Sequence, residues 1–202
     1  MLKHPGYSAV LLASLMLQAC TTLQTSNPTR TATEELLIST AADRAAHRLA
    51  SQLTTSGLVF VDSSFFEGTD SKQAIGAIRN SLLSQGVPLT SERSKADTIV
   101  EIRAGALSTD RQSFLVGIPS FSLPMPLSDS SITVPELALY GKNTQIGVAS
   151  FSAVSYDART GRYLDARSAQ LGESHNDKIS AAFVFSWTNN DTRPAAPPLL
   201  KD

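Results

Sequence analysis

The chain has a single cysteine, Cys20, which follows a short apolar stretch near the N-terminus. One cysteine cannot form a disulfide within the chain, so the core must hold the folded part together by itself. Before it come a short segment with Lys3 and an apolar run at residues 7–17. This order is typical of a signal peptide, and the run is shorter than the ~20 residues that a membrane-spanning helix needs. We therefore expect residues 1–19 to be a signal peptide.

The residues around Cys20 resemble a lipobox, with Leu17 three positions before the cysteine and the small Ala19 directly before it. The resemblance implies cleavage between Ala19 and Cys20 and lipidation of the cysteine sulfur by fatty acids such as palmitate. Thr21 stands where an aspartate would favour retention in the inner membrane, which implies the outer membrane. Two alternatives stay open: an ordinary secretory signal in which Cys20 is incidental, or a short buried helix.

Both ends of the expected mature chain have the composition of linkers. Residues 20–30 are mostly polar, and ten such residues have an r.m.s. reach of about 17 Å. The folded domain would then lie close to the membrane, facing the periplasm. Residues 189–202 are rich in proline and are expected to be disordered. Residues 31–188 remain as one domain, long enough to bury a core of its own.

The composition argues against two classes of partner. The net charge is −1, which gives no electrostatic basis for binding nucleic acid. It also gives none for a polybasic segment on an anionic membrane surface. Hydrophobic residues make up 42% of the chain and charged residues 17%, so an ordinary globular domain is expected.

The spacing of apolar residues predicts two helices. From Ile38 to Leu53 they recur at intervals of three and four, after capping-box spacing between Thr31 and Glu34. Alanines in this stripe would let the helix lie close to a sheet. A second helix is expected over residues 70–85. Strands are expected at residues 58–61, 97–106, 136–140, 144–156, 162–171 and about 182–187, with a short edge strand at 87–90.

This order of elements predicts an α+β fold: a mixed, mostly antiparallel sheet with two helices packed on one face. Residues 141–143 read Gly-Lys-Asn and are expected to form a hairpin turn. Residues 173–177 are expected to form a polar loop. Residues 112–135 contain four prolines and are expected to form a long apolar loop.

The apolar loop supplies the candidate contact residues. If it is exposed, it forms an apolar surface for an envelope protein partner, for self-association or for the membrane. The alternative is that it folds back over the sheet as cover. Its prolines argue against a membrane-spanning helix. The candidate contact residues are Phe114, Leu115, Ile118, Phe121, Leu123 and Met125.

No combination of residues predicts catalysis or metal binding. His47 lies one helical turn from Asp43, which is typical of a solvated contact. Ser174 and His175 lie near Asp177 in sequence, whereas the base of a catalytic triad is held from elsewhere in the fold. Two distant histidines and a lipidated cysteine do not match a zinc site, and no glycine-rich phosphate loop is present. We predict a protein that is not an enzyme and has no cofactor.

Two stretches resemble a known family. The run from Arg30 to Arg44, directly after the lipobox cysteine, resembles the uncharacterised bacterial lipoproteins of the domain of unknown function 6655, as does the run from Tyr156 to Gly161. The resemblance covers about residues 20–187 and implies no known activity. The layout is also similar to periplasmic domains of curli-secretion-type lipoproteins, at the level of architecture.

These observations favour an envelope lipoprotein that acts through protein contacts, in assembly or scaffolding. An alternative is a small-ligand or glycan-binding module that uses a cleft between the loop and the sheet. A third, a hydrolase, would need Ser174, His175 and a distant acid to converge.

Overall fold

The computed structural model describes residues 30–124 and 131–192. Residues 32–202 form one compact unit, separate from residues 1–31. Several predicted features lie outside the described residues. They are the signal peptide, Cys20 with its cleavage site, the tether up to residue 29, Met125, and the tail from residue 193.

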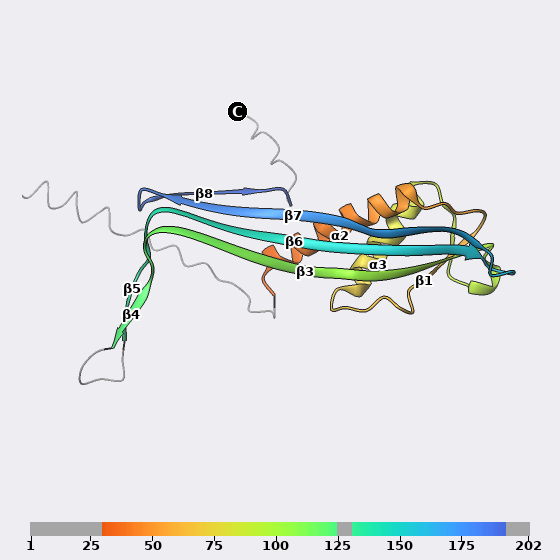
Figure 1. Cartoon of the computed structure of the whole chain (residues 1–202), viewed down its shortest axis with the longest axis horizontal. Coiled ribbons are helices and arrows are strands. Elements are labelled where there is room, and N and C mark those ends of the chain that lie inside the picture. The colour runs from red at the N-terminus through yellow and green to blue at the C-terminus, as the bar shows by residue number, and fades with distance from the viewer. Residues whose placement is uncertain (1–29, 125–130, 193–202) are drawn as a thin grey trace, which may run out of the picture. The chain divides into compact units, whose positions relative to one another are not determined.

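Two α-helices and eight strands make up the described part of residues 32–202 (Figure 1). The elements in chain order are α2 (Ala32–Gln52), β1 (Val59–Asp62), α3 (Ser71–Ser84), β2 (Leu89–Thr90), a 3-10 turn η1 (Arg93–Lys95), β3 (Thr98–Ile118), β4 (Phe121–Pro124), β5 (Ser131–Val134), β6 (Leu137–Asp157), β7 (Tyr163–Ala181) and β8 (Phe185–Asn190).

Six of the strands form one sheet in the order β2-β1-β3-β6-β7-β8. β2, β1 and β3 run parallel, and β3, β6, β7 and β8 alternate in direction. β4 and β5 form a separate antiparallel hairpin. The sheet is therefore mixed and mostly antiparallel, and the predicted α+β fold with two helices is confirmed.

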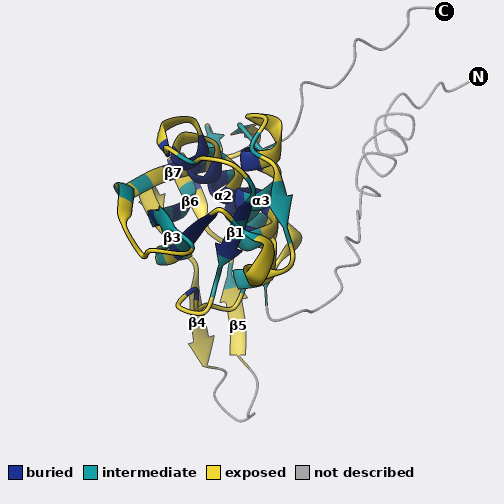
Figure 2. Ribbon diagram, turned by 90° about the vertical axis from the view of Figure 1, so that its right-hand side faces the viewer, coloured by how far each residue is buried: buried dark blue, intermediate teal, exposed yellow. Residues whose placement is uncertain are grey.

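The core lies between the two helices and one part of the sheet, where the buried residues gather (Figure 2). Phe151 on β6 is its largest fully buried side chain, and its ring lies 5.4 Å from that of Phe66. The helices contribute mainly alanine and leucine, and the strands contribute valine, alanine, isoleucine and phenylalanine. The buried cluster comprises Ala41, Ala42, Ala45, Ala46, Leu49, Ala50, Leu53, Val59, Val61, Phe66, Ala74, Ala77, Ile78, Leu82, Val100, Ile102, Ala149, Phe151 and Ala153.

The alanine stripe of α2 packs on glycines of the sheet. Gly147 in β6 faces the backbone of Leu37, and Gly172 in β7 faces the backbone of Ala41. A Cβ atom at either glycine would overlap helix backbone atoms, so α2 lies closer to the sheet than any larger residue there would allow. The expectation of a close helix–sheet contact is confirmed.

The helices cover only one half of the long strands (Figure 1). Near the start of α2, the Ser174 hydroxyl donates a 2.7 Å hydrogen bond to the Leu37 carbonyl oxygen. Beyond this level the strands continue as a four-stranded extension of β3, β6, β7 and β8, with side chains largely exposed on both faces. The chain therefore has a packed half and an extended half.

The prediction of a long loop at residues 112–135 is wrong. Residues 112–118 continue β3 and pair with β6, and residues 121–124 and 131–134 form the β4–β5 hairpin. The described prolines of this region lie between strands or at the end of β4, where a missing N–H does not interrupt a ladder. Phe114 and Val116 are exposed, and Leu115 between them is half-buried, as alternation along a strand requires.

Three further predictions, of a turn, a loop and the last strand, are wrong. Gly-Lys-Asn at 141–143 is not a turn, because β6 runs through it and is paired on both sides. The polar residues 173–177 are not a loop but part of β7. The last strand is β8 at 185–190, and residues 182–184 form the turn before it, so the fold extends two residues past the predicted boundary at 188.

Candidate functional site

The extended half of the sheet has one apolar face near its end. The strand register aligns side chains in rows across β3, β6, β7 and β8, and residues of one row share a face. Two alternate rows are mostly apolar. They are Phe114-Lys142-Ile179-Trp187 and Val116-Tyr140-Ala181-Phe185. Within them, the rings of Phe114 and Tyr140 lie 6.2 Å apart.

The opposite face of the same strands is polar or small. Its rows are Arg111-Gln145-Asn176-Asn190, Ser113-Asn143-Lys178-Thr188 and Leu115-Gly141-Ser180-Ser186. The extension is thus an amphipathic sheet, with side chains segregated by the two-residue period of its strands. No described helix packs on either of these faces at this end (Figure 1).

The turn between β7 and β8 is unusually apolar. It consists of Ala182, Phe183 and Val184, and the last two side chains are 62% and 79% exposed. Ala182 and Phe183 have φ angles of 48° and 67°, in the left-handed region that favours glycine or asparagine. The amides of both residues donate hydrogen bonds to carbonyl oxygens of β6. The chain therefore holds a phenylalanine in a strained, exposed position.

The β4–β5 hairpin repeats the amphipathic pattern. Its pairing places Phe121, Leu123, Ile132 and Val134 on one face. Ser122, Pro124, Ser131 and Thr133 lie on the other. The first three apolar side chains are about half exposed.

The end of the extension carries few charges. In residues 112–124, 131–141 and 179–190 the single charged residue is Glu136. Lys142, Asp177 and Lys178 lie at its border, and the Lys142 ammonium lies 3.1 Å from the Asp177 carboxylate. Hydrogen bonding by Thr144 is the main cause that lowers the pKa of Asp177, and Lys142 adds to it.

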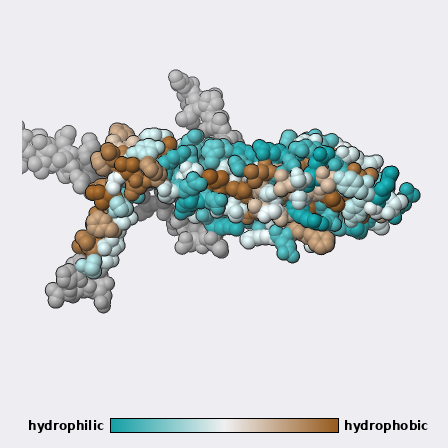
Figure 3. Space-filling view, in the orientation of Figure 1, coloured by the Kyte–Doolittle hydropathy of each residue, from teal (hydrophilic) through white to brown (hydrophobic). Residues whose placement is uncertain are grey.

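We call this region the apolar end. It holds thirteen of the eighteen large apolar side chains that are exposed among the described residues, and Figure 3 shows them gathered at the end of the sheet and along the hairpin. Its members are Phe114, Val116, Ile118, Phe121, Leu123, Ile132, Leu137, Leu139, Tyr140, Phe183, Val184, Phe185 and Trp187. An apolar surface of this kind marks a contact site for a protein or a membrane.

The predicted contact residues are placed there in part. Phe114, Ile118, Phe121 and Leu123 belong to the apolar end, whereas Leu115 is half-buried on the opposite face. The sequence prediction missed the residues from 132 to 140 and from 183 to 187. The alternation of apolar side chains around residues 179–187 is the signal that could have indicated them.

Ser174 and His175 do not form a catalytic pair. As neighbours in β7 they face opposite sides of the sheet: Ser174 is buried under α2, and His175 is exposed. His175 Nδ1 lies 3.1 Å from the carboxylate of Asp191, which also contacts Arg44 on α2. Burial opposes ionisation of Asp191, but hydrogen bonds from the His175 amide and Arg44 outweigh it and lower the pKa.

The remaining candidates for chemistry lie on the surface. His47 and Asp43 are exposed on α2, beside Arg44 and Arg48. In the described ranges, no three histidine, cysteine or acidic residues converge as metal ligands do.

None of the described helices has the length and apolar character needed to cross a bilayer.

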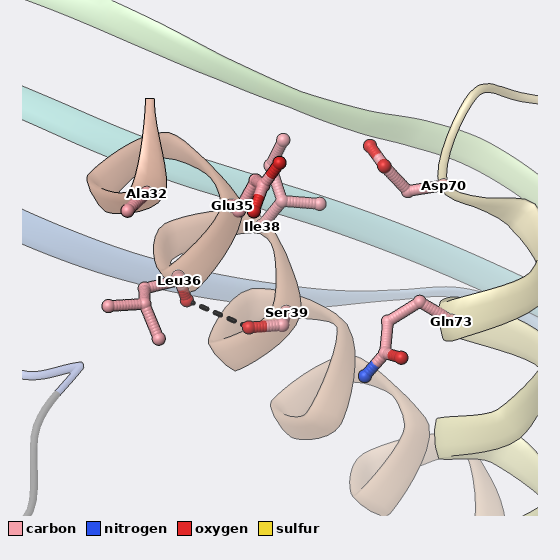
Figure 4. A pocket seen from close by; sticks show the side chains of 7 residues that line it. All are labelled: Ala32, Glu35, Leu36, Ile38, Ser39, Asp70 and Gln73. Atoms are coloured by element: carbon pink, nitrogen blue, oxygen red, sulfur yellow. Dashed lines mark hydrogen bonds between the residues drawn. The ribbon is translucent and has the colours of Figure 1, made fainter. Parts of the chain in front are cut away.

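A hollow of about 550 Å³ lies between the first turns of α2 and α3 (Figure 4). Glu35 and Ser39 line it from α2, and Asp70 and Gln73 from the start of α3. The Ser39 hydroxyl donates a 3.1 Å hydrogen bond to the Leu36 carbonyl oxygen of its own helix. The hollow is within the size range of small-molecule sites, with two carboxylates on its wall.

A family of unknown function, DUF6655, matches residues 15–176, most of the chain. This chain belongs to the DUF6655 family. The match in this DUF6655 protein begins before Cys20 and continues into β7, so it includes both helices and most of the long strands. No curated protein matches the chain.

Proposed function

We propose that this DUF6655 protein is a lipoprotein of the bacterial envelope, anchored through acylated Cys20 and facing the periplasm, at the outer membrane. Its folded domain acts through contacts of the apolar end and not through catalysis. The observation that carries the proposal is the apolar end itself, an exposed surface of thirteen large apolar side chains with few charged residues around it.

The energetics of exposure support a contact role. Each large apolar side chain left in water forgoes about 1.5–3 kcal/mol relative to full burial. Thirteen such side chains lie at one end of the domain, and Phe183 is held there in a strained turn. Contact with a partner surface would cover these side chains and lower the free energy. The side chains considered for catalysis are dispersed over the domain, which favours a contact role over an enzymatic one.

The anchor rests on the lipobox residues Leu17, Ala19 and Cys20. Cleavage before Cys20 would leave the lipidated cysteine joined to the domain by a short polar tether. Because two or more acyl chains hold a protein firmly to a bilayer, the domain would stay at the membrane.

The test is incorporation of labelled palmitate by the wild type and by Cys20→Ala in a bacterial host, followed by membrane fractionation. Thr21→Ala is the matched control, since it changes a neighbouring residue without removing the acylated sulfur. We expect the label and the membrane association to be lost together in Cys20→Ala and kept in Thr21→Ala. An unlabelled wild-type protein in a host that processes lipoproteins would refute the proposed anchor.

A second candidate function, binding of a small ligand, is favoured by the hollow between α2 and α3. The sequence predicted a ligand cleft between a loop at residues 112–135 and the sheet, but residues 112–118 are part of β3. The hollow lies elsewhere, beside the two helices. The protein purified from its native envelope would carry a small molecule detectable by native mass spectrometry. That mass would disappear in Ser39→Trp, which fills the hollow, and a bare wild-type protein would argue against this function.

A further inference from the structure

α2 runs away from the apolar end of the sheet. Near its start, Leu37 accepts a hydrogen bond from Ser174, and just after its end the Thr54 carbonyl oxygen accepts one of 2.9 Å from Ser155. In the ladder of β6 and β7, Ser174 lies nearer the apolar end than Ser155 does. The N-terminal end of α2 therefore faces the apolar end (Figure 1).

The chain that precedes α2 is long enough to connect this side of the domain to a bilayer. Glu34 in the first turn of α2 lies 3.7 Å from Arg111 on β3. Arg111 is five residues from Val116, which is about 17 Å at the rise of a strand. Ten tether residues have a similar r.m.s. reach, about 17 Å. An acylated Cys20 would thus keep a bilayer surface within reach of the apolar end.

The chemistry of the apolar end matches a lipid surface. Aliphatic and phenylalanine side chains lie at its turn and hairpin, where hydrocarbon would receive them. Tyr140 and Trp187 combine an apolar ring with a polar group, which suits the boundary between acyl chains and headgroups. Lys142 lies at the border of the apolar face, where its ammonium group can face anionic headgroups while its stem lies along apolar surface.

We infer that the apolar end inserts side chains of the β7–β8 turn and the β4–β5 hairpin into the surface of the bilayer that holds the lipid anchor. The inference rests on the lipoprotein function proposed above. The insertion is shallow, because β8 and the part of β3 beyond Glu101 pair on one side only within the described residues. Unpaired backbone groups at these edges need water or headgroups, since hydrocarbon offers no hydrogen bonds.

A lipid surface fits the apolar face better than a second copy of the chain. Lys142 lies in the same row as Phe114, Ile179 and Trp187, with Asp177 as its ionic partner. Packing this face against another copy would remove the ion pair from water, which costs more than the pair regains unless every polar atom finds a partner. At a lipid surface, both groups stay hydrated among the headgroups.

The experiment uses a chain from Thr21 to Asp202, which lacks the acylated cysteine. It retains the complete buried cluster, whose members lie between Ala41 and Ala153, and the whole compact unit that begins at Ala32, so we expect it to fold. The probe is vesicles of phosphatidylcholine with phosphatidylglycerol, followed by flotation. Trp187 is the single tryptophan of the chain and is 51% exposed at the apolar end, so its fluorescence reports on this surface alone. Brominated lipids report its depth by quenching.

The test variant is Phe183→Asp, and the matched control is Phe65→Asp, which adds the same charge. Phe65 is as exposed as Phe183, 62%, but it lies in the packed half beside Arg103. Aspartate tolerates the left-handed conformation of position 183, so the test variant keeps its fold. Far-UV circular dichroism and the thermal midpoint check this for both variants.

We expect the Thr21–Asp202 chain to float with vesicles, with Trp187 emission shifted to shorter wavelength and quenched by brominated lipid. The test variant should bind at least about tenfold more weakly, and the control should bind like the wild type. Failure of this chain to bind vesicles, or equal binding by the test variant, would overturn the inference and leave the palmitate result untouched. A vesicle-free shift of Trp187 emission together with a doubled mass in sedimentation would overturn it in favour of self-association.

Discussion

Gly172 of β7 lies directly against the backbone of Ala41 in α2, so close that a Cβ atom at position 172 would overlap the Ala41 carbonyl oxygen. It would also meet the amide nitrogen of Ala45, one turn further along the helix. Backbone atoms of a helix cannot rotate aside as a flexible side chain can. The glycine therefore sets the distance between α2 and the sheet, and the small side chains of the helix stripe follow from that distance.

Gly172→Ala should lower the free energy of unfolding by about 3 kcal/mol, because the added methyl group must push α2 away from the core. Gly76→Ala is the matched control, since Gly76 lies within α3 with open space around it. The control should raise the free energy of unfolding by about 1 kcal/mol through helix propensity. Urea unfolding followed by circular dichroism measures both. A Gly172→Ala protein as stable as the wild type would contradict the packing.

The sequence predicts one partner of this contact and not the other. The alanine stripe from Ala41 to Ala50 is a local signal, since its three- and four-residue spacing appears within one helix. The need for glycine at 147 and 172 arises from a helix more than one hundred residues earlier. No local pattern around Gly147 or Gly172 indicates that contact.

Ser174→Ala should lower the free energy of unfolding by about 1 kcal/mol. Its hydroxyl is buried and donates a 2.7 Å hydrogen bond to the Leu37 carbonyl oxygen, which alanine cannot replace. Ser186→Ala, on the exposed polar face of β8, should leave the stability unchanged within about 0.5 kcal/mol. Equal losses in the two variants, measured by urea unfolding, would contradict a structural role for Ser174.

The stability of the domain should fall in acid, and Asp165 should account for part of the loss. The backbone amide of Thr54 donates a 2.9 Å hydrogen bond to its carboxylate and is the main cause that lowers the pKa of Asp165, with Arg167 adding to it. In the unfolded chain an aspartate has a pKa of about 3.9. The unfolded chain thus binds more protons below that value, so this contribution is present above about pH 5 and is lost as the pH falls through the folded pKa.

The measurement is the free energy of unfolding in urea between about pH 5 and pH 3 for the wild type and Asp165→Asn. Asparagine does not titrate, so the variant should show a smaller decrease over this range. The variant should still lose some stability in acid, since the pKa values of Asp62, Asp177 and Asp191 are lowered as well and these groups titrate in both proteins. Identical slopes would show that Asp165 does not contribute.

The extended half of the sheet was not predicted, because its local sequence favours turns whereas pairing with distant strands makes it extended. Gly141, Lys142 and Asn143 form a good turn sequence, but β3 and β7 pair with this segment from both sides and override it. Pro119 and Pro124 suggested a loop. However, proline is compatible with the ends of strands, which is where both residues lie. The apolar end is formed by pairing between strands that are distant in sequence, and no neighbouring helix pattern indicates where these strands end. It could therefore be predicted only in part.

The strained turn at Ala182 and Phe183 should be replaceable by a more stable one at the expense of membrane contact. Ala182→Asn with Phe183→Gly supplies the residues that favour positive φ at both positions, and should raise the free energy of unfolding by about 1–2 kcal/mol. The same variant loses an exposed aromatic side chain from the apolar end, so the shift of Trp187 emission with vesicles should weaken. Ser186→Gly, in the extended backbone of β8, is the control and should lower the stability by about 1 kcal/mol. A turn variant that is no more stable, or that binds vesicles as the wild type does, would show that Phe183 is not held there for contact. A gain in stability together with a loss of vesicle binding would show that this turn lowers the stability of the domain while it presents an aromatic side chain to the membrane.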